Sequence, residues 1–133
     1  MCIIARINKE DYKLYNWNEC VNYLMEQNII SLNANKKNII EMILKNQDIL
    51  TVGLGYIDGG FIQFVKSDKE PPYYATYNSH YKNTDVRVFY RDEEYYTEIE
   101  AKHIIPIDKL VALIKKFYDN EFSDFSNDGW IEI

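Results

Sequence analysis

The apolar and polar positions of the chain repeat with two different periods, and each period predicts one kind of element. Residues 2–7 are nearly all apolar and predict a first strand. We expect a helix to begin near Asn16, because Asn16 can cap it and Glu19 stands at the capping-box position three residues later. Its expected apolar face has helical spacing and comprises Trp17, Cys20, Val21, Leu24 and Met25.

The middle of the chain contains short apolar runs separated by turn residues, which is typical of consecutive strands. These strands are expected at residues 39–44, 49–54, 61–65 and 73–77, and in a hairpin over 85–100. They are separated by polar loops at 33–38 and 78–84, by a turn at 58–60 (Asp-Gly-Gly), by Pro71-Pro72, and by the hairpin's own turn at 91–93. Within 85–100 the side chains alternate strictly, as on the two faces of paired strands.

A second helix is predicted from Pro106, a residue favoured at the first helical position, and Asn120 can end it. Its apolar stripe comprises Ile107, Leu110, Val111, Ile114, Phe117 and Tyr118. Residues 129–133 form a short closing strand. The order strand, helix, several strands, helix, strand predicts a single α+β domain over 1–133, with a mostly antiparallel sheet of about six to eight strands and two main helices.

Length and cysteine content limit the kind of protein this can be. A chain of 133 residues can bury about two-thirds of its unfolded surface, so its core needs no disulfide or metal. Cys2 and Cys20 form no disulfide framework, and Cys20 is expected to be a buried free thiol. The first residues have no basic leader, and no apolar run approaches the roughly 18 residues of a membrane span. We therefore expect a cytoplasmic protein that does not enter a membrane.

The charge of the chain is −6 and its pI is about 4.9, which argues against direct binding of nucleic acid. An acidic chain can instead attract a basic protein partner, although mild acidity also serves solubility alone. The 12 tyrosines favour strands and binding surfaces, but an AT-rich genome would produce the same bias. Composition leaves both alternatives open.

Motifs for metal or cofactor chemistry are incomplete in this sequence. His80 and His103 lack companions at metal-ligand spacing; His80 is expected to be solvated and His103 structural. Residues 53–58 begin like a dinucleotide fingerprint, but Asp58 replaces the third glycine and a strand follows instead of a helix. Glycines at a strand end or bulge explain that segment better. We expect no cofactor, no metal and no enzymatic activity.

A row of carboxylates marks the second strand of the hairpin, where Glu94, Glu98 and Glu100 are expected to share one face with Tyr96. Two such groups in a cleft could perform acid–base catalysis. The row could also be an ordinary solvated strand face. In a third interpretation it is an anionic, aromatic surface for a basic partner, with Tyr96 at the contact centre.

Several segments together are similar to one known family. They are residues 50–55 (Leu-Thr-Val-Gly-Leu-Gly), 72–74 (Pro-Tyr-Tyr), 88–90 (Val-Phe-Tyr) and 104–106 (Ile-Ile-Pro), the apolar helix that follows, and the pair Trp130 and Glu132. In this order and spacing the chain resembles immunity protein family one of bacterial polymorphic toxin and contact-dependent inhibition systems, from about residue 2 to 132. It departs from the family's pattern at 75–79, where Ser and Gly-Asp are usual, and at Asp92-Glu93, which replace a turn glycine.

The resemblance implies a non-catalytic protein that binds a cognate toxin domain, such as a nuclease or a nucleic-acid deaminase, and occludes its active site or substrate groove. Trp130 and Glu132 would be family signature residues with a structural role: Trp130 in the core and Glu132 beside a donor. The predicted toxin-binding residues are Tyr77, His80, Tyr81, Glu94, Tyr96, Glu98 and Glu100. The chain would act as a monomer, or as a homodimer through an exposed edge strand. The alternatives are an acidic inhibitor or DNA mimic that blocks another nucleic-acid enzyme, and a small carboxylate-dependent enzyme.

Overall fold

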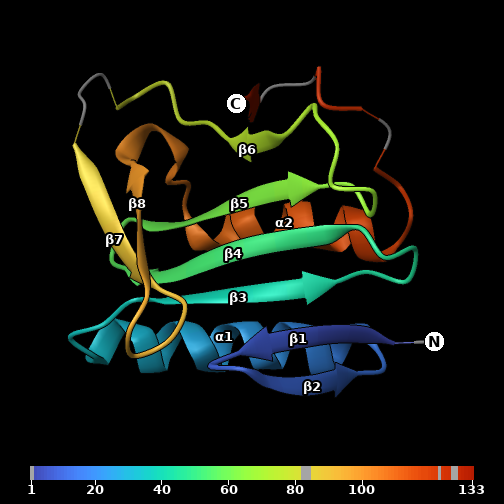
Figure 1. Cartoon of the computed structure of the whole chain (residues 1–133), viewed down its shortest axis with the longest axis horizontal. Coiled ribbons are helices and arrows are strands. Elements are labelled where there is room, and N and C mark those ends of the chain that lie inside the picture. Colours follow the sequence, from blue (N-terminus) through green and yellow to red (C-terminus); the bar gives the residue numbers. More distant parts are fainter. Residues whose placement is uncertain (1, 82–84, 123, 127–128) are drawn as a thin grey trace.

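Two helices cover one face of a nine-stranded sheet in the computed structural model, which describes residues 2–81, 85–122, 124–126 and 129–133 (Figure 1). Residues 82–84, at the end of the expected 78–84 loop, lie outside the described residues. Strand pairing is antiparallel throughout, except for one parallel bridge between Asn38 and Tyr90. The expected α+β class with a mostly antiparallel sheet is confirmed.

The elements follow the expected order, with one additional strand near the N-terminus. They are β1 (Ile3–Ile7), β2 (Glu10–Leu14), α1 (Trp17–Asn33), β3 (Asn38–Ile43), β4 (Ile49–Tyr56), β5 (Gly59–Val65), β6 (Tyr74–Thr76), β7 (Val86–Tyr90), β8 (Tyr96–Glu100), the 3₁₀ turn η1 (Ala101–His103), α2 (Ile107–Tyr118) and β9 (Trp130–Glu132). The sheet runs β2-β1-β3-β4-β5-β6-β9, and β7 joins it at β3 and carries β8. The pattern missed β2 because only its last residue, Leu14, is buried.

Helix α1 begins as expected, and most of its expected apolar face is buried or half-buried, but the buried stripe continues beyond that face. The Asn16 side chain accepts a hydrogen bond from the Glu19 amide at 2.9 Å, which confirms the cap. The buried positions are Cys20, Leu24, Asn28 and Ser31, whereas Met25, expected in the apolar face, is 38% exposed. The helix can bury Ser31 because its hydroxyl accepts a hydrogen bond from the side-chain amide of Asn38 at 3.1 Å.

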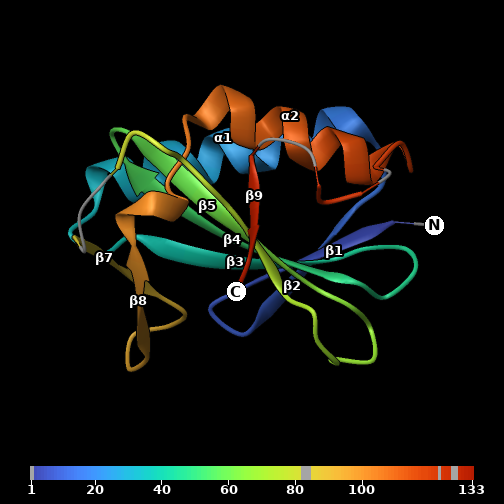
Figure 2. The same cartoon turned by 90° about the horizontal axis from the view of Figure 1, so that it is seen from above.

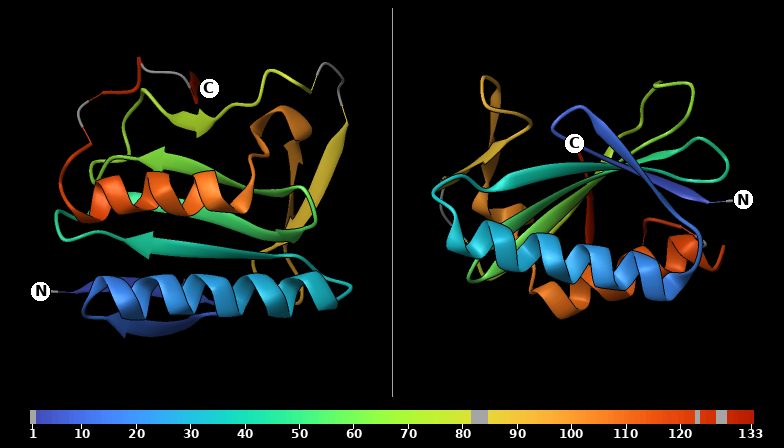
Figure 3. Two further views of the ribbon diagram at one scale, coloured as in Figure 1. Left: turned by 180° about the vertical axis from the view of Figure 1, so that it is seen from behind. Right: turned by 90° about the horizontal axis from the view of Figure 1, so that it is seen from below.

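Helix α2 follows the prediction more closely. Leu110, Ile114 and Phe117 are buried, and the rest of the expected stripe is half-buried. Pro106 lies at the N-cap, one residue before the position expected for it. Asn120 has a φ of 56°, the left-handed conformation that commonly ends a helix. Figure 3 shows the two helices side by side across the same face of the sheet.

Two apolar clusters hold the molecule together, one on each face of the sheet. The larger lies between the sheet and the helices and includes Leu24, Leu110 and Trp130. The smaller lies on the opposite face, under the β7–β8 hairpin, and comprises Ile39, Phe61, Phe89, Ile99 and Ile104. The second cluster fixes the hairpin to the sheet by apolar burial, which is the dominant favourable contribution to folding.

The glycines of the β4–β5 hairpin serve close backbone approach, as expected for a strand end or bulge. Gly55 has a φ of 116° beside the register shift between Gly53 and Tyr56. A Cβ on Gly60 would lie 2.0 Å from the Gly53 carbonyl oxygen, and one on Gly59 would lie 1.7 Å from the Ile105 carbonyl oxygen. Neither position can therefore accept a side chain without movement of the backbone.

In the described part of the chain, no helix combines the length and the apolar character that crossing a membrane requires.

Candidate functional site

The β7–β8 hairpin projects from the sheet on the side opposite the helices (Figure 2). Strand β7 touches β3 through the single bridge between Asn38 and Tyr90 and then diverges from it. Where the two strands separate, the Tyr56 hydroxyl donates to the Val88 carbonyl at 2.9 Å and accepts from the Val88 amide at 3.1 Å. A side chain thus satisfies backbone groups that a neighbouring strand would otherwise bond.

The two faces of this hairpin differ in chemistry. Phe89 and Ile99 face inward and lie in the smaller apolar cluster. The outward face consists of three cross-strand pairs: Val86 with Glu100, Val88 with Glu98, and Tyr90 with Tyr96. The rings of Tyr90 and Tyr96 lie 5.8 Å apart, and Tyr96 is 59% exposed. The outward face therefore presents an aromatic residue next to two carboxylates.

Charge is concentrated on this hairpin. Residues 85–100 contain six carboxylates and two guanidinium groups, a charge of −4 out of −6 for the whole chain. Both guanidinium groups bind carboxylates outside the hairpin, since Arg87 pairs with Asp58 and Arg91 with Glu41. Among the described residues, the lysine partners of the hairpin acids are Lys102, 3.3 Å from Glu100, and Lys9, 3.9 Å from Asp92. Lys36 also lies at the turn, where it donates to the Glu93 carbonyl at 3.4 Å, and the side chains of Glu93, Glu94 and Glu98 have no ion pair with a described residue.

Of the predicted contact residues, Tyr96, Glu98 and Glu100 lie exposed on one face of β8, in the expected arrangement. Glu94 does not share that face, because the turn extends over 91–95 instead of 91–93. The Arg91 amide bonds the Tyr95 carbonyl at 2.9 Å, and the Glu94 amide donates to the Asp92 carboxylate at 2.8 Å. The turn is longer because Asp92 caps two of its amides.

The predicted contact residues before the hairpin lie beside its base but differ in how far their side chains are exposed. The Asn78 amide bonds the Lys102 carbonyl at 2.6 Å, which ties this segment to η1. Tyr77 is 38% exposed, and His80 is exposed as expected. Tyr81 is half-buried, and its hydroxyl donates to Asp58, so its polar end is directed at the β4–β5 turn.

A cluster of polar side chains that the sequence did not reveal joins the hairpin to the β4–β5 turn. Asp58 accepts two hydrogen bonds from the Arg87 guanidinium, each of 2.9 Å, and one from the Tyr81 hydroxyl. The Arg87 hydrogen bond is the main cause that lowers the pKa of Asp58 below its ordinary value. The guanidinium also lies 5.1 Å from the Tyr56 ring centroid. This cluster ties the hairpin to the β4–β5 turn.

His103 and Trp130 have the structural positions expected of them. The His103 ring nitrogen Nδ1 lies 2.9 Å from the Thr76 carbonyl, in a buried setting. Trp130 is 9% exposed and packs edge-to-face against Phe117 and Phe125. Glu132 is exposed on β9, and within the described part of the chain its carboxylate has no hydrogen bond or ion pair, in contrast to the donor expected beside it.

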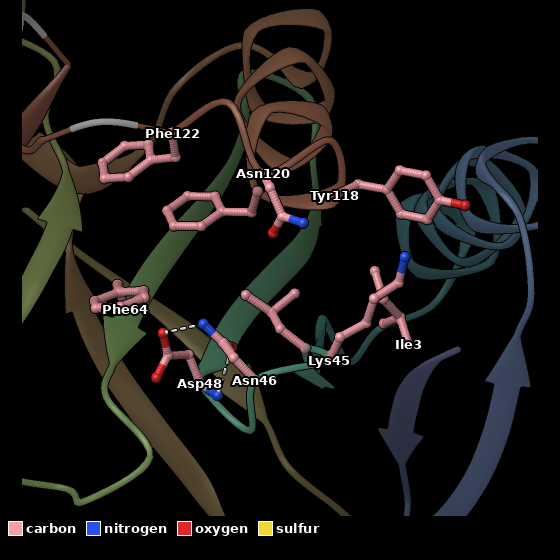
Figure 4. Close-up of a pocket in the computed structure, with 10 residues that line it drawn as sticks. Ile3, Lys45, Asn46, Asp48, Phe64, Tyr118, Asn120 and Phe122 are labelled. Atoms are coloured by element: carbon pink, nitrogen blue, oxygen red, sulfur yellow. Dashed lines mark hydrogen bonds between the residues drawn. The ribbon is translucent and has the colours of Figure 1, made fainter. Parts of the chain in front are cut away.

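Two hollows open elsewhere on the molecule. The first, of about 440 Å³, has Phe64, Phe122 and Tyr118 on its walls and the linked side chains of Asn46 and Asp48 at its rim (Figure 4). The second, of about 410 Å³, lies on the open face of the sheet and contains a single acidic side chain, Glu41. Each hollow thus has one acidic side chain, and neither has the close carboxylate pair of the enzyme alternative.

No group of three metal-capable side chains is assembled among the residues that the structure describes.

Searches against protein-family models, curated proteins and solved structures find no match for this chain. The candidate site is therefore defined by the geometry and the charge of the hairpin.

Proposed function

We propose that this chain is an immunity protein that binds a cognate bacterial toxin domain, such as a nuclease or nucleic-acid deaminase, and occludes its active site or substrate groove. The observation that carries the proposal is the projecting hairpin, with an exposed Tyr96 beside Glu98 and Glu100 and a charge of −4 over residues 85–100. The resemblance of segments along the chain to an immunity family supports the same function.

The chemistry of the hairpin suits a basic partner. A toxin that acts on nucleic acid has a groove rich in Lys and Arg, and opposite charge both accelerates encounter and fixes orientation. Tyrosine is enriched among the residues that dominate binding energy, because its rigid ring loses little conformational entropy. Tyr96 would supply the anchor and the carboxylates the steering.

The distribution of charge separates this function from general nucleic-acid mimicry. Outside residues 85–100 the chain has 15 acidic and 13 basic residues, so little net charge remains there. A mimic of the phosphate backbone needs acids spread over a long surface, because one phosphate recurs for about every 1.7 Å of duplex axis. A single acidic hairpin fits one localised contact better.

The test is calorimetric titration of this protein with a catalytically inactive form of the toxin domain encoded by the adjacent upstream gene. We expect a one-to-one complex with a dissociation constant near or below 1 nM, about −12 kcal/mol. The interface should bury about 800 Å² on each partner. Co-expression with the active toxin domain should restore growth of the host cells.

A matched pair of triple variants locates the surface. E94K/E98K/E100K should weaken binding at least about a hundredfold, or about 2.8 kcal/mol. E26K/E70K/E121K changes the net charge by the same amount at three exposed glutamates away from the hairpin, and it should bind like the wild type at physiological salt. Equal binding by both variants would exclude the hairpin as the site, and no binding by the wild type would reject the proposal.

A further inference from the structure

The free edge of β8 presents backbone groups that have no partner strand. Among the strands that the structure describes, β8 pairs with β7 alone. The Arg91 amide bonds the Tyr95 carbonyl, and the Ala101 amide bonds the Asp85 carbonyl, so the odd-numbered residues of β8 make the ladder bonds to β7. The amides and carbonyls of Tyr96, Glu98 and Glu100 therefore point away from β7. The same three residues also have exposed side chains.

The other edge of the hairpin is bonded at Val88 and Tyr90. The outward amide and carbonyl of Val88 both bond the Tyr56 hydroxyl, and the Tyr90 amide donates to the Lys37 carbonyl at 2.6 Å. No backbone hydrogen bond links the corresponding groups of β8 to any described residue outside β7. The difference shows that the chain satisfies one edge and leaves the second available.

The two other edge strands of the sheet, β2 and β9, differ from β8 in charge or in length. Strand β2 carries both signs of charge, and its Asp11 pairs with Arg6 on β1 at 2.7 Å. Strand β9 spans only three residues, Trp130–Glu132. Strand β8 has five residues, and its charged side chains, Glu98 and Glu100, are both negative. An incoming strand on β8 would thus meet two carboxylates of the strand itself, with Lys102 beside Glu100.

We propose that the free edge of β8 is a strand-addition site, and that its occupant is an extended, basic segment of the toxin. This inference rests on the proposed function and names the mode of contact. Backbone hydrogen bonds would come from Tyr96, Glu98 and Glu100, and side chains directly across the ladder would lie about 5 Å from theirs. The occupant should therefore carry Lys or Arg at two alternate positions, opposite Glu98 and Glu100.

A second copy of this chain is a poorer occupant of the same edge. Antiparallel pairing of two β8 strands centred on Glu98 sets that carboxylate against its own copy. A shift by two residues sets Glu98 against Glu100. Like charges directly opposite each other destabilise a strand pair, whereas a basic strand gains at both positions. The charge of the edge therefore selects a partner of opposite sign.

The proposal can be tested with a proline that removes one outward amide. In E98P the amide lost is one that β7 does not use, and proline is tolerated on an edge strand whose N–H faces solvent. E98A is the matched control, because it loses the same carboxylate and keeps the amide. Strand addition predicts that E98P binds the inactive toxin domain at least tenfold more weakly than E98A. Equal affinity of the two variants would refute it.

Hydrogen exchange on the wild-type protein gives a second test that does not depend on the folding of a variant. In the free protein the amides of Tyr96, Glu98 and Glu100 should exchange quickly, while those of Thr97 and Ile99 are protected by the β7 ladder. In the complex the three outward amides should slow at least a hundredfold. If they continue to exchange at the free rate in a saturated complex, strand addition is wrong although the immunity function stands. If the wild type does not bind the toxin domain at all, both proposals fail.

Discussion

Replacement of Asp58 by asparagine should loosen the hairpin from the sheet at little change in shape. Asp58 accepts two hydrogen bonds of 2.9 Å from Arg87 and one from Tyr81. Asparagine offers one oxygen and one amide group, so a donor would face a donor and the guanidinium would lose its counter-charge. The side chains of Arg87 and Asp58 are 23% and 28% exposed, so solvent screening weakens their interaction.

The expected cost follows from these contacts. Hydrogen bonds to charged groups contribute about 1.5–3 kcal/mol each when well shielded, so a loss of about 2 kcal/mol is reasonable for this partly exposed set. For a chain of this length that loss lowers Tm by about 6–8 °C. Urea unfolding at pH 7 measures it directly. A double-mutant cycle with Arg87→Met, which keeps the apolar stem, should give a coupling of about 1–2 kcal/mol.

The stability difference between the wild type and D58N should also depend on pH. Because the folded-state pKa of Asp58 is lowered, chiefly by the Arg87 hydrogen bond, the stabilisation is present in full above the ordinary value of 3.8 and is lost as the pH falls through the folded value. The stability difference between wild type and D58N should stay constant from about pH 8 to 5 and close below about pH 4. A difference under about 0.5 kcal/mol at pH 7, or one that persists in acid, would refute this reasoning.

Three further predictions concern buried groups. Thr76→Val should lower the free energy of unfolding by about 2 kcal/mol in urea, because the Thr76 hydroxyl donates to the His103 carbonyl at 2.7 Å and accepts from the Ile62 amide at 3.1 Å. A neutral result would mean that water replaces both bonds. Trp130→Ala should cost about 3–5 kcal/mol by the same assay, through the loss of its ring contacts; a cost below about 1 kcal/mol would contradict its placement in the core. Burial raises the pKa of Cys20 to about 12, so a thiol reagent at pH 8 should modify it only after denaturant is added. Rapid modification of Cys20 in the native protein would show that the thiol is accessible.

Elements with a strong repeating pattern could be predicted from the sequence, and contacts between distant segments could not. The 3.6-residue period of α2 and the alternation in β8 survive in the structure because burial follows them. Strand β2 was missed because its stability comes from pairing with β1 while its side chains stay in water. The stripe of α1 was predicted only as far as Met25, because the buried positions after Leu24, Asn28 and Ser31, are polar.

The candidate site shows the same division. The common face of Tyr96, Glu98 and Glu100 follows from strand alternation alone. The departure of Glu94 depends on capping by Asp92, which lengthens the turn. The pairing of Asp58 with Arg87 joins residues 29 positions apart, and no local pattern specifies it. Turn chemistry and long-range polar pairing are thus what a single sequence fails to reveal.

The Tyr56 hydroxyl, which bonds the backbone of β7, affects how the sequence of this protein can diverge in evolution. It lets the hairpin leave the sheet after a single bridge, so the attachment depends on a few inward-facing residues such as Arg87, Phe89 and Ile99. Among the described residues, the side chains at the outward positions of β8 make no hydrogen bond or ion pair with the main sheet, and their contacts are with Tyr90 and Lys102. Substitutions at these positions can accumulate at little cost in stability, so related proteins could diverge in partner choice while they inherit one scaffold. A graft of foreign outward residues onto this hairpin should transfer binding without a redesign of the core.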